Sequence, residues 1–464
     1  MNINLFDKEI KTYIDLVKDK LLGLEKRAYV YTFGCQQNEA DSEKIRGILS
    51  LMSYKITNEP KEADVIIINT CAVRRLAELK ALSMLGNFKE LKRNNPELIV
   101  GVAGCMAAEE HIVMQLKKSF HFVSFTVEPG MIHKIPELVY SAMESNRRSF
   151  VFGTENVNII EGVEPVRQNG HKAWVSVMHG CNNFCSYCIV PYVRGRERSR
   201  KSKDVIEECR KLIPLGCKEI TLLGQNVNSY RDDMDFARLM EKIAQIQGDF
   251  LIRFMTSHPK DVSDDLIDVM AKYRDKIAPH FHLPLQSGSD AILKKMNRTY
   301  DMEKFYATVR KIRDKIPDIS LTSDIIVGFP GESDGDFEAT MTALEAIRFD
   351  MVYSFNYSKR EGTRAAQMKE QVEKSVKTER MTRLLNVQTE ISHEINEKYV
   401  GTQARVLVDS YSEADGKYTA RTASNKLVHF TGKTAVPGNF AYVNITKAGA
   451  FDLFGEEIED KNNG

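Results

Sequence analysis

The chain has 464 residues, 42% of them hydrophobic, a mean hydropathy of −0.34 and a net charge of +1. These values describe a globular protein of two to four domains, and they exclude nucleic-acid binding through overall positive charge. The first residues lack the pattern of a secretion signal, and no run approaches about 18 apolar residues, so we expect a cytoplasmic protein without a membrane partner. The glycosylation acceptor Asn297-Arg298-Thr299 has no meaning in such a protein.

Eight cysteines in a reducing compartment favour metal binding or redox chemistry over disulfides. Six of them form two groups of three. The others, Cys209 and Cys217, lie in or just after a helical segment predicted over residues 205–217. We interpret these two as buried thiols.

Three apolar segments near the start of the chain each lead into a cysteine and then a helical stretch. Continuous apolar runs that alternate with helices predict a parallel sheet, and ligands bind such sheets beyond the carboxyl ends of the strands. We therefore expect the three thiols to converge, although three buried cysteines would give the same pattern. Glycines 34 and 104 would let the backbone approach a bulky group. The segments are 28–32, 65–69 and 98–103, and the cysteines are Cys35, Cys71 and Cys105.

A second group of thiols has the tight spacing C-x-x-x-C-x-x-C at Cys181, Cys185 and Cys188. Three cysteines could hold zinc or an iron–sulfur cluster, and in a cubane cluster they leave one iron open to another ligand. A zinc knuckle needs a fourth ligand at finger spacing, and His179 is too close to Cys181 to supply it. The segment resembles the cluster signature of radical S-adenosylmethionine (SAM) enzymes.

Residues 147–171 are polar and irregular, which predicts a linker, and six strand–helix units follow it. Six units favour a partial (β/α)6 barrel over a closed eight-fold barrel, with functional groups at the carboxyl ends of the strands. By position, Gln225, Ser257, Gln286 and Asp324 are candidates to bind SAM. The predicted strands are 174–178, 219–223, 250–255, 280–283, 319–327 and 351–356, and the predicted helices are 202–215, 236–247, 263–273, 291–296 with 302–315, and 335–347.

The sequence pattern changes in the last hundred residues. Long charged helices over 364–398 precede short alternating segments at 404–408, 417–422, 427–430 and 440–445. These segments predict a small antiparallel β-barrel. We interpret the acidic residues 456–460 as a frayed tail.

Three motifs, at residues 32–43, 69–74 and 180–200, give nearly the whole chain its resemblance to the methylthiotransferases, a radical SAM family. The match is to the MiaB branch in particular, although Gln37 stands where that branch has Met. The resemblance implies an α/β multidomain protein. Its parts would be an N-terminal α/β domain over 26–146, a radical SAM core over 167–398 and a TRAM domain over 399–462.

The resemblance also implies the cofactors and the reaction. Cys181, Cys185 and Cys188 would hold the SAM-binding [4Fe–4S] cluster, and Cys35, Cys71 and Cys105 an auxiliary one. One SAM would methylate a sulfur on the auxiliary cluster, and a second SAM would give the radical that lets the methylthio group join C2 of N6-isopentenyladenosine beside the tRNA anticodon. Two alternatives stay open: a sister enzyme acting on threonylcarbamoyl-adenosine in tRNA or on a ribosomal-protein aspartate, and a non-catalytic RNA-binding zinc protein.

The partners follow from the same resemblance: tRNA with isopentenylated adenosine, an electron donor such as flavodoxin or ferredoxin, and no second copy of the chain. No catalytic residue is expected beyond the cluster cysteines. Arg194 begins a basic run that could meet SAM or tRNA phosphate, or could be a solvated, salt-bridged face. In the small barrel, Arg405, Tyr418 and Arg421 are the candidate RNA contacts.

Overall fold

The protein is described by a computed structural model that covers residues 2–4, 7–72, 75–145, 147–151, 159–168 and 170–458. The chain forms two compact units. Unit 1 comprises Met1–Gln168, Met178–Asn182 and Cys188–Arg200, and unit 2 comprises Asn169–Val177, Asn183–Tyr187 and Lys201–Gly464. No helix within the covered ranges is long and apolar enough to cross a bilayer.

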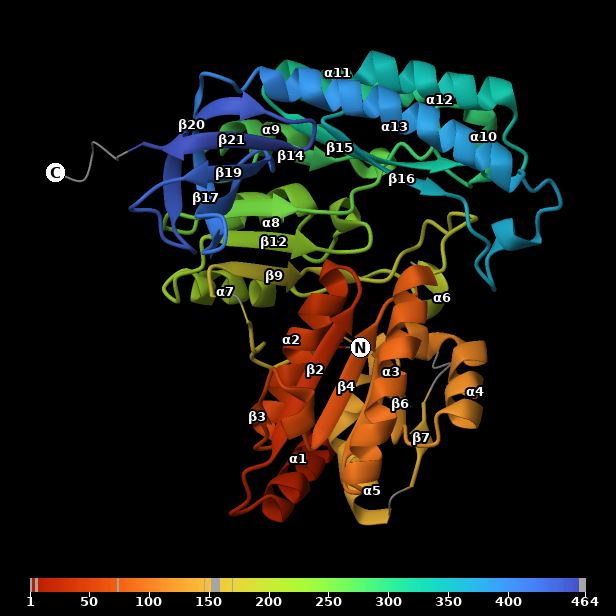
Figure 1. Ribbon diagram of the computed structural model, residues 1–464, viewed down its shortest axis with the longest axis vertical. Coiled ribbons are helices and arrows are strands. Elements are labelled where there is room, and N and C mark those ends of the chain that lie inside the picture. The colour runs from red at the N-terminus through yellow and green to blue at the C-terminus, as the bar shows by residue number, and fades with distance from the viewer. Residues whose placement is uncertain are drawn as a thin grey trace. The chain divides into compact units, whose positions relative to one another are not determined.

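A six-stranded parallel sheet forms the centre of unit 1 (Figure 1). All residues of the neighbouring strands β4 and β5 are buried, which requires helices on both faces of the sheet. The predicted parallel sheet is confirmed. The strand order is β3 (Lys55–Ile56), β2 (Arg27–Phe33), β4 (Val65–Thr70), β5 (Ile99–Gly104), β6 (Phe125–Val127) and β7 (Ser149–Phe150).

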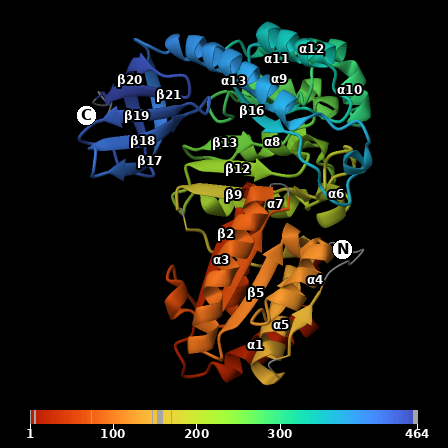
Figure 2. The ribbon, with the colours of Figure 1, turned by 45° about the vertical axis from the view of Figure 1, so that its right-hand side comes forward.

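Helices cover both faces of this sheet (Figure 1 and Figure 2). Successive side chains of a strand point to opposite faces, so Val65 and Ile67 of β4 pack with one set of helices and Ile66 and Ile68 with the other. The first set is α1 (Lys8–Lys20), α2 (Gln36–Leu51) and α5 (Ile135–Ser145), and the second is α3 (Arg75–Asn94) and α4 (Glu110–Ser119).

Most of the described part of the predicted linker, residues 147–151 and 159–168, belongs to unit 1 and forms regular structure. It contributes the edge strand β7 and the short strand β8 (Ile159–Glu161), which pairs with β1 (Asn2–Asn4). Lys44 donates to the carbonyl of Ile160 at 3.1 Å, and the amide of Val166 donates to the carbonyl of Glu43 at 3.0 Å. The prediction of a plain linker is therefore wrong here, because backbone pairing replaces the missing apolar pattern.

Unit 2 contains the predicted partial barrel, built from two three-stranded parallel sheets. A bridge between Ile252 and Ile277 continues from one sheet to the other. In the described part of the chain, β9 and β16 each pair on one side only, so the barrel is open between them. The strands are β9 (Lys172–Ser176), β12 (Glu219–Leu223), β13 (Leu251–Phe254), β14 (His280–His282), β15 (Ser320–Val327) and β16 (Met351–Asn356).

Amphipathic helices follow the barrel strands in the predicted order. Their ends are set by capping: Ser263, Asp301 and Ser333 each accept a backbone hydrogen bond at a helix start. The helices are α7 (Ser202–Leu212), α8 (Phe236–Ala244), α9 (Asp264–Lys272), α10 (Asp290–Lys295), α11 (Met302–Lys315) and α12 (Asp334–Ile347).

The predicted helices over 364–398 are shorter than expected. A single 3-10 turn spans Arg364–Gln367, and the long helix α13 covers only Lys374–Glu397. Helix α13 runs along the outside of the barrel (Figure 1), where Arg380 pairs with the buried carboxylate of Glu332 at 2.6 Å.

A closed five-stranded barrel ends the chain, confirming the predicted small β-barrel. One strand was missed: Glu456 and Glu457 are paired in β21 rather than frayed, while residues 459 and 460 lie outside the described part. Glu457 accepts backbone hydrogen bonds from Lys433 and Thr434, which explains an acidic residue in a strand. β21 pairs parallel with β19, so one pair departs from the antiparallel pattern. The strands are β17 (Gln403–Ser412), β18 (Lys417–Thr422), β19 (Leu427–Thr431), β20 (Phe440–Ala448) and β21 (Asp452–Glu457).

Candidate active site

Three thiols meet at the carboxyl edge of the unit 1 sheet. Cys71 and Cys105 directly follow β4 and β5, and Cys35 comes two residues after β2. A side-chain hydrogen bond from Cys71, aided by the charge of Arg194, lowers the pKa of Cys35 to about 6. Burial raises the pKa of Cys105, although Arg194 opposes this effect. The structure thus brings together the three cysteines that lie 36 and 34 residues apart in sequence.

Buried amide groups connect the three strand ends. Asn38, in the first turn of α2, accepts from the amide of Cys35 at 3.4 Å and donates to the carbonyl of Thr70 at 3.0 Å. Asn69 donates to the carbonyl of Asn38 at 2.7 Å, and the hydroxyl of Thr70 donates to Ala103 at 2.8 Å. These bonds fix the backbone at Cys35 and just before Cys71 and Cys105, and so they orient the three thiols.

Two glycines are required by this network. A Cβ atom on Gly104, which has a φ of +93°, would lie 2.3 Å from Asn69 Oδ1 and 2.4 Å from the Thr70 carbonyl. A Cβ atom on Gly34 would lie 2.5 Å from Asn38 Oδ1. At these two glycines the backbone therefore comes close to Asn38, Asn69 and Thr70, in addition to any approach to a bulky group.

Arg194 joins the same site from the basic run. Its Nε donates to the sulfur of Cys105 at 3.1 Å, and its Nη2 donates to Asp41 at 2.8 Å. Arg194 and Asp41 are both buried. The structure therefore groups Arg194 with the N-terminal thiols, while its predicted contact with SAM stays a prediction.

The second cysteine segment begins with a tight turn in unit 1. The short strands β10 (Met178–His179) and β11 (Arg198–Ser199) pair antiparallel on either side of it. The amide of Cys181 donates to the carbonyl of Gly195 at 3.1 Å. Gly180 has a φ of +76°, and a Cβ atom there would lie 2.0 Å from the carbonyl oxygen of Arg196. Only glycine fits at this turn.

Cys188 leads directly into the short helix α6 (Val190–Val193). Ile189 and Val193 pack with Ala72 and Cys105 in a small apolar cluster of unit 1. The segment that follows the third cysteine of one set therefore packs against a cysteine of the other set.

Cys185 is held within unit 2 by residues that follow α10. Asn297 donates from Nδ2 to the carbonyls of Asn183 and Phe184, both at 3.0 Å. Arg298 donates to the sulfur of Cys185 at 3.5 Å and is itself half-buried. These contacts attach the segment around Cys185 to the end of α10.

The four SAM candidates of unit 2 follow or lie within barrel strands. Ser257 and Asn226, the neighbour of Gln225, bury oxygen atoms that have no hydrogen-bond partner among the described atoms. Gln286 has a φ of +70° and donates its amide to the carbonyl of Asp324 at 2.8 Å. Asp324 itself lies mid-strand in β15 rather than at its end. Two unsatisfied buried oxygens beyond β12 and β13 fit a polar ligand there.

Thiols, the usual ligands of iron–sulfur clusters, are the donor type of both cysteine sets. Each set supplies three thiols, and in each set an arginine donates to one sulfur. Among the side chains that the structure describes, no three His, Cys, Asp or Glu residues are close enough to enclose a single metal ion.

Comparisons with known proteins supply the family. Three family models match the chain: Uncharacterized protein family UPF0004 over residues 27–127, the Radical SAM superfamily over 175–344 and the TRAM domain over 397–458. A tRNA-2-methylthio-N(6)-dimethylallyladenosine synthase of Thermoanaerobacter sp. (strain X514) is 45% identical over 466 residues, 99% of each chain. Another, of Acetivibrio thermocellus, is 48% identical over 458 residues, 98% of this chain and 95% of the relative. The chain belongs to this synthase family.

Membership of the synthase family makes the chain a radical SAM enzyme, whose cofactors are SAM and [4Fe–4S] clusters. The zinc alternative has no support from these relatives. Among solved structures, the radical SAM methyltransferase TsrM of Kitasatospora setae, with cobalamin and a [4Fe–4S] cluster bound, has a TM-score of 0.55. It is 13% identical and covers 74% of each chain, so this similarity concerns the fold alone.

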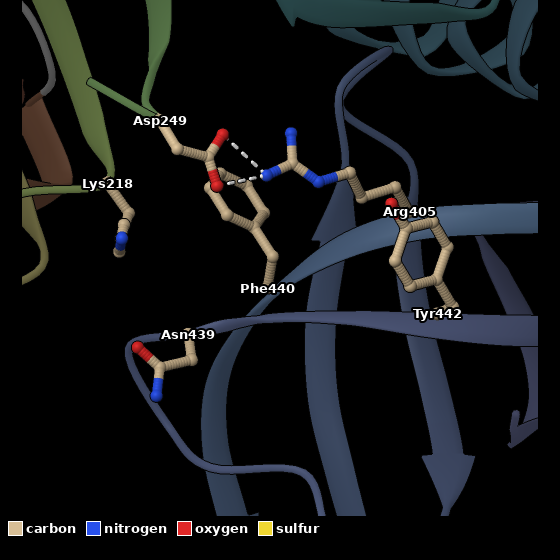
Figure 3. Close-up of a pocket in the computed structure, with 6 residues that line it drawn as sticks. All are labelled: Lys218, Asp249, Arg405, Asn439, Phe440 and Tyr442. Carbon is tan, nitrogen blue, oxygen red and sulfur yellow. Dashed lines mark hydrogen bonds and ion pairs between the residues drawn. The ribbon is translucent and has the colours of Figure 1, made fainter. Parts of the chain in front are cut away.

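The TRAM barrel of this synthase family member helps to line a polar pocket of about 350 Å³ within unit 2 (Figure 3). The guanidinium of Arg405 lies 3.6 Å from the ring centre of Phe440 and pairs with Asp249 at 2.6 Å. Lys218 and Asp249 reach the pocket from the core, while Arg405, Asn439, Phe440 and Tyr442 come from the small barrel.

The other two RNA candidates lie differently. Tyr418 stacks on Phe430, with ring centres 5.1 Å apart and an interplanar angle of 20°. Arg421 forms an ion pair with Asp409, with 4.0 Å between Nε and Oδ2. Arg405 is thus the candidate that borders the pocket, and all three contacts with RNA stay predictions.

Several residues that organise these sites are not indicated by sequence patterns. Asn38 and Asp41 lie inside the first motif, so their spacing from Cys35 was the available signal. Asn297 and Arg298 were read only as part of a glycosylation acceptor, and nothing local indicates their contacts with the cysteine segment.

Proposed function

We propose that the chain transfers a methylthio group to C2 of N6-isopentenyladenosine next to the anticodon of tRNA. The printed activity of its full-length relatives supports this reaction. The observation that carries the proposal is the convergence of Cys35, Cys71 and Cys105. It gives the chain a three-thiol site in addition to the radical SAM motif.

The substrate explains why two such sites are needed. The C2–H of adenine is far too weak an acid for a side-chain base to remove, so acid–base catalysis cannot start the reaction. When bound, SAM and the two clusters supply a methyl group, a sulfur and a radical able to take that hydrogen. The protein's part is to bind, orient and shield these groups.

Different residues would bind the two clusters and SAM. Cys35, Cys71 and Cys105 would hold the auxiliary cluster, with Asn38 and Asn69 fixing their backbone. The residues that would hold the SAM-binding cluster are Cys181, Cys185 and Cys188. The unsatisfied oxygens of Asn226 and Ser257 would pair with polar atoms of SAM. Flavodoxin or ferredoxin would supply the electron, in the cytoplasm, to a monomeric enzyme.

The pocket beside Arg405 is suited to grip RNA. A guanidinium on an aromatic ring, with Lys218 and the exposed ring of Tyr442 nearby, offers a phosphate contact and a stacking surface. The exposed pair with Asp249 is worth only about 0–1 kcal/mol, so a phosphate can compete for Arg405.

Binding experiments test this contact. Arg405→Ala should weaken tRNA binding and reduce the slope of log K against log salt by about 0.7–0.9, one phosphate contact. Asp249→Asn should leave binding equal or tighter. Equal affinity and salt dependence for wild type and Arg405→Ala would rule out this contact.

The substrate assignment is tested with two tRNA preparations, one with and one without the isopentenyl group. Anaerobic reactions with SAM and a reductant should form methylthiolated nucleoside only with the first, as measured by mass spectrometry. Equal product with both would contradict the proposed substrate and favour a sister enzyme.

A further inference from the structure

Arg194 is a buried cation, and only part of its guanidinium group has hydrogen-bond partners. Two of its nitrogens are engaged, Nε by the sulfur of Cys105 and Nη2 by Asp41, as described above. The third, Nη1, is buried and has no hydrogen-bond partner among the described residues. A buried guanidinium N–H without an acceptor is costly, so an acceptor is expected to fill that place.

The charge balance of the site indicates what kind of acceptor fits. Asp41 is 5% exposed and neutralises the single positive charge of Arg194, which is 3% exposed. Gln37 donates to the other carboxylate oxygen of Asp41 at 3.2 Å and keeps it oriented. The remaining donor therefore has no carboxylate as a partner, and the thiols of Cys105 and Cys35 both interact with the charge of Arg194. Sulfur or an anion bound to a metal suits this position.

The position of Arg194 in the chain adds a second constraint. Five residues lie between it and Cys188, and the six residue steps from Cys188 to Arg194 span at most about 20 Å. Ile189 and Val193, between the two, pack with Cys105 and Ala72. One short segment therefore carries a ligand of the SAM-binding set and a hydrogen-bond donor of the auxiliary set.

We propose that Arg194 is a positioning residue of the auxiliary cluster, holding the sulfur of Cys105 through Nε and donating through Nη1 to the cluster or its added ligand. The proposal rests on the proposed function only in that Cys35, Cys71 and Cys105 hold a cluster. Hydrogen bonds and positive charge at ligand sulfurs favour the reduced, more negative state of a cluster. Arg194 therefore raises the reduction potential of this cluster.

The test uses full-length chain in which Cys181, Cys185 and Cys188 are replaced by Ala, so that only the auxiliary cluster is loaded. Redox titration followed by electron paramagnetic resonance then gives its midpoint potential and spectrum. Arg194→Gln should make the potential more negative and change the spectrum, and Arg194→Lys should restore part of the shift. Asp41→Asn, which leaves the guanidinium uncompensated, should shift the potential in the opposite direction.

Arg200→Gln is the matched control. Arg200 is equally buried, lies in the same basic run and pairs with Glu161 through two bonds of 2.6 and 2.8 Å. Its replacement should leave potential and spectrum unchanged. If Arg194→Gln binds no iron while Arg200→Gln does, the result supports the place of Arg194 at the cluster. Arg194→Lys and Asp41→Asn then still show in which direction the midpoint potential changes. Unchanged potentials in all Arg194 and Asp41 variants would overturn the proposal. No tRNA enters this measurement, so its outcome is independent of the substrate.

Discussion

Gly104 shows how strictly single residues shape the auxiliary site. Its φ is +93°, and a Cβ atom would have two oxygen atoms within 2.4 Å, which leaves no room for a side chain. We expect Gly104→Ala to lower the unfolding free energy by about 1–3 kcal/mol and to reduce iron at this site, because Asn69 and Thr70 must move. Chemical denaturation and iron analysis measure the two effects.

Gly86 offers the matched control for that substitution. It lies exposed in α3, and a Cβ atom there would meet nothing within 4 Å. Gly86→Ala should stabilise the helix by about 0.5–1 kcal/mol and leave the iron content unchanged. A Gly104→Ala protein as stable and iron-rich as Gly86→Ala would contradict the steric argument.

His258, next to the SAM candidate Ser257, makes stability depend on pH. Burial, reinforced by the charges of Arg298 and Lys260, lowers the pKa of His258 to about 2, and its Nδ1 accepts from the amide of Lys260 at 3.2 Å. The unfolded chain, with a pKa near 6.5, binds one more proton below that pH, so stability falls on acidification.

The contribution of His258 to the pH dependence of stability is large enough to measure. Between pH 6 and 4, His258 should contribute about 1.4 kcal/mol of lost stability per pH unit, and His258→Gln should remove that share of the slope. Urea unfolding at several pH values gives the slope. A variant slope equal to that of the wild type would show that His258 is protonated in the folded protein.

At the residue scale, spacing alone predicted the six cysteines as cluster ligands, since thiols after successive strands or at C-x-x-x-C-x-x-C intervals are typical of such ligands. It could not reveal Asn38, Asp41, Asn297 or Arg298. Amide and guanidinium groups are common on surfaces, and only the fold shows that these four contact the cysteine segments.

At the element scale, the segment around Cys185 depends on the end of α10. Asn297 has a φ of +61° and bonds two carbonyls of the segment. Asn297→Gly keeps this backbone conformation but removes both bonds, each worth about 1 kcal/mol. We expect slower formation of 5′-deoxyadenosine from SAM and weaker iron binding by the SAM-binding set, with the auxiliary set unchanged.

Asn425 provides the control, because it also has a positive φ, of +68°, but lies in the TRAM barrel between β18 and β19. Asn425→Gly should leave SAM cleavage as in the wild type. Equal rates of 5′-deoxyadenosine formation in the two variants would show that Asn297 does not hold the cysteine segment.

Elements with strong periodicity were predicted well, and weak ones were not. The six barrel strands and the strands before Cys35, Cys71 and Cys105 occur where apolar runs placed them. Strands β7, β8 and β21 were missed because their stability comes from pairing partners distant in sequence, such as β19 with β21. Local pattern does not contain that information.

At the scale of the whole molecule, we expect the two thiol sets to fail separately because each would hold its own cluster. The sets do not coincide with the two units: Cys35, Cys71 and Cys105 lie in unit 1 together with Cys181 and Cys188, whereas Cys185 and the SAM candidates Gln225, Ser257, Gln286 and Asp324 lie in unit 2. The domain limits at 26–146, 167–398 and 399–462 stay predictions. The central claim is that one set supplies the sulfur and the other the radical.

One assay of a single variant tests that claim most directly. With Cys35, Cys71 and Cys105 replaced by Ala, we expect SAM still to be cleaved to 5′-deoxyadenosine while no methylthiolated tRNA forms. Replacing the buried Cys209 and Cys217 by Ala should preserve both products, and circular dichroism must show that each variant is folded. A folded triple variant that still produced methylthiolated tRNA would contradict the two-cluster account.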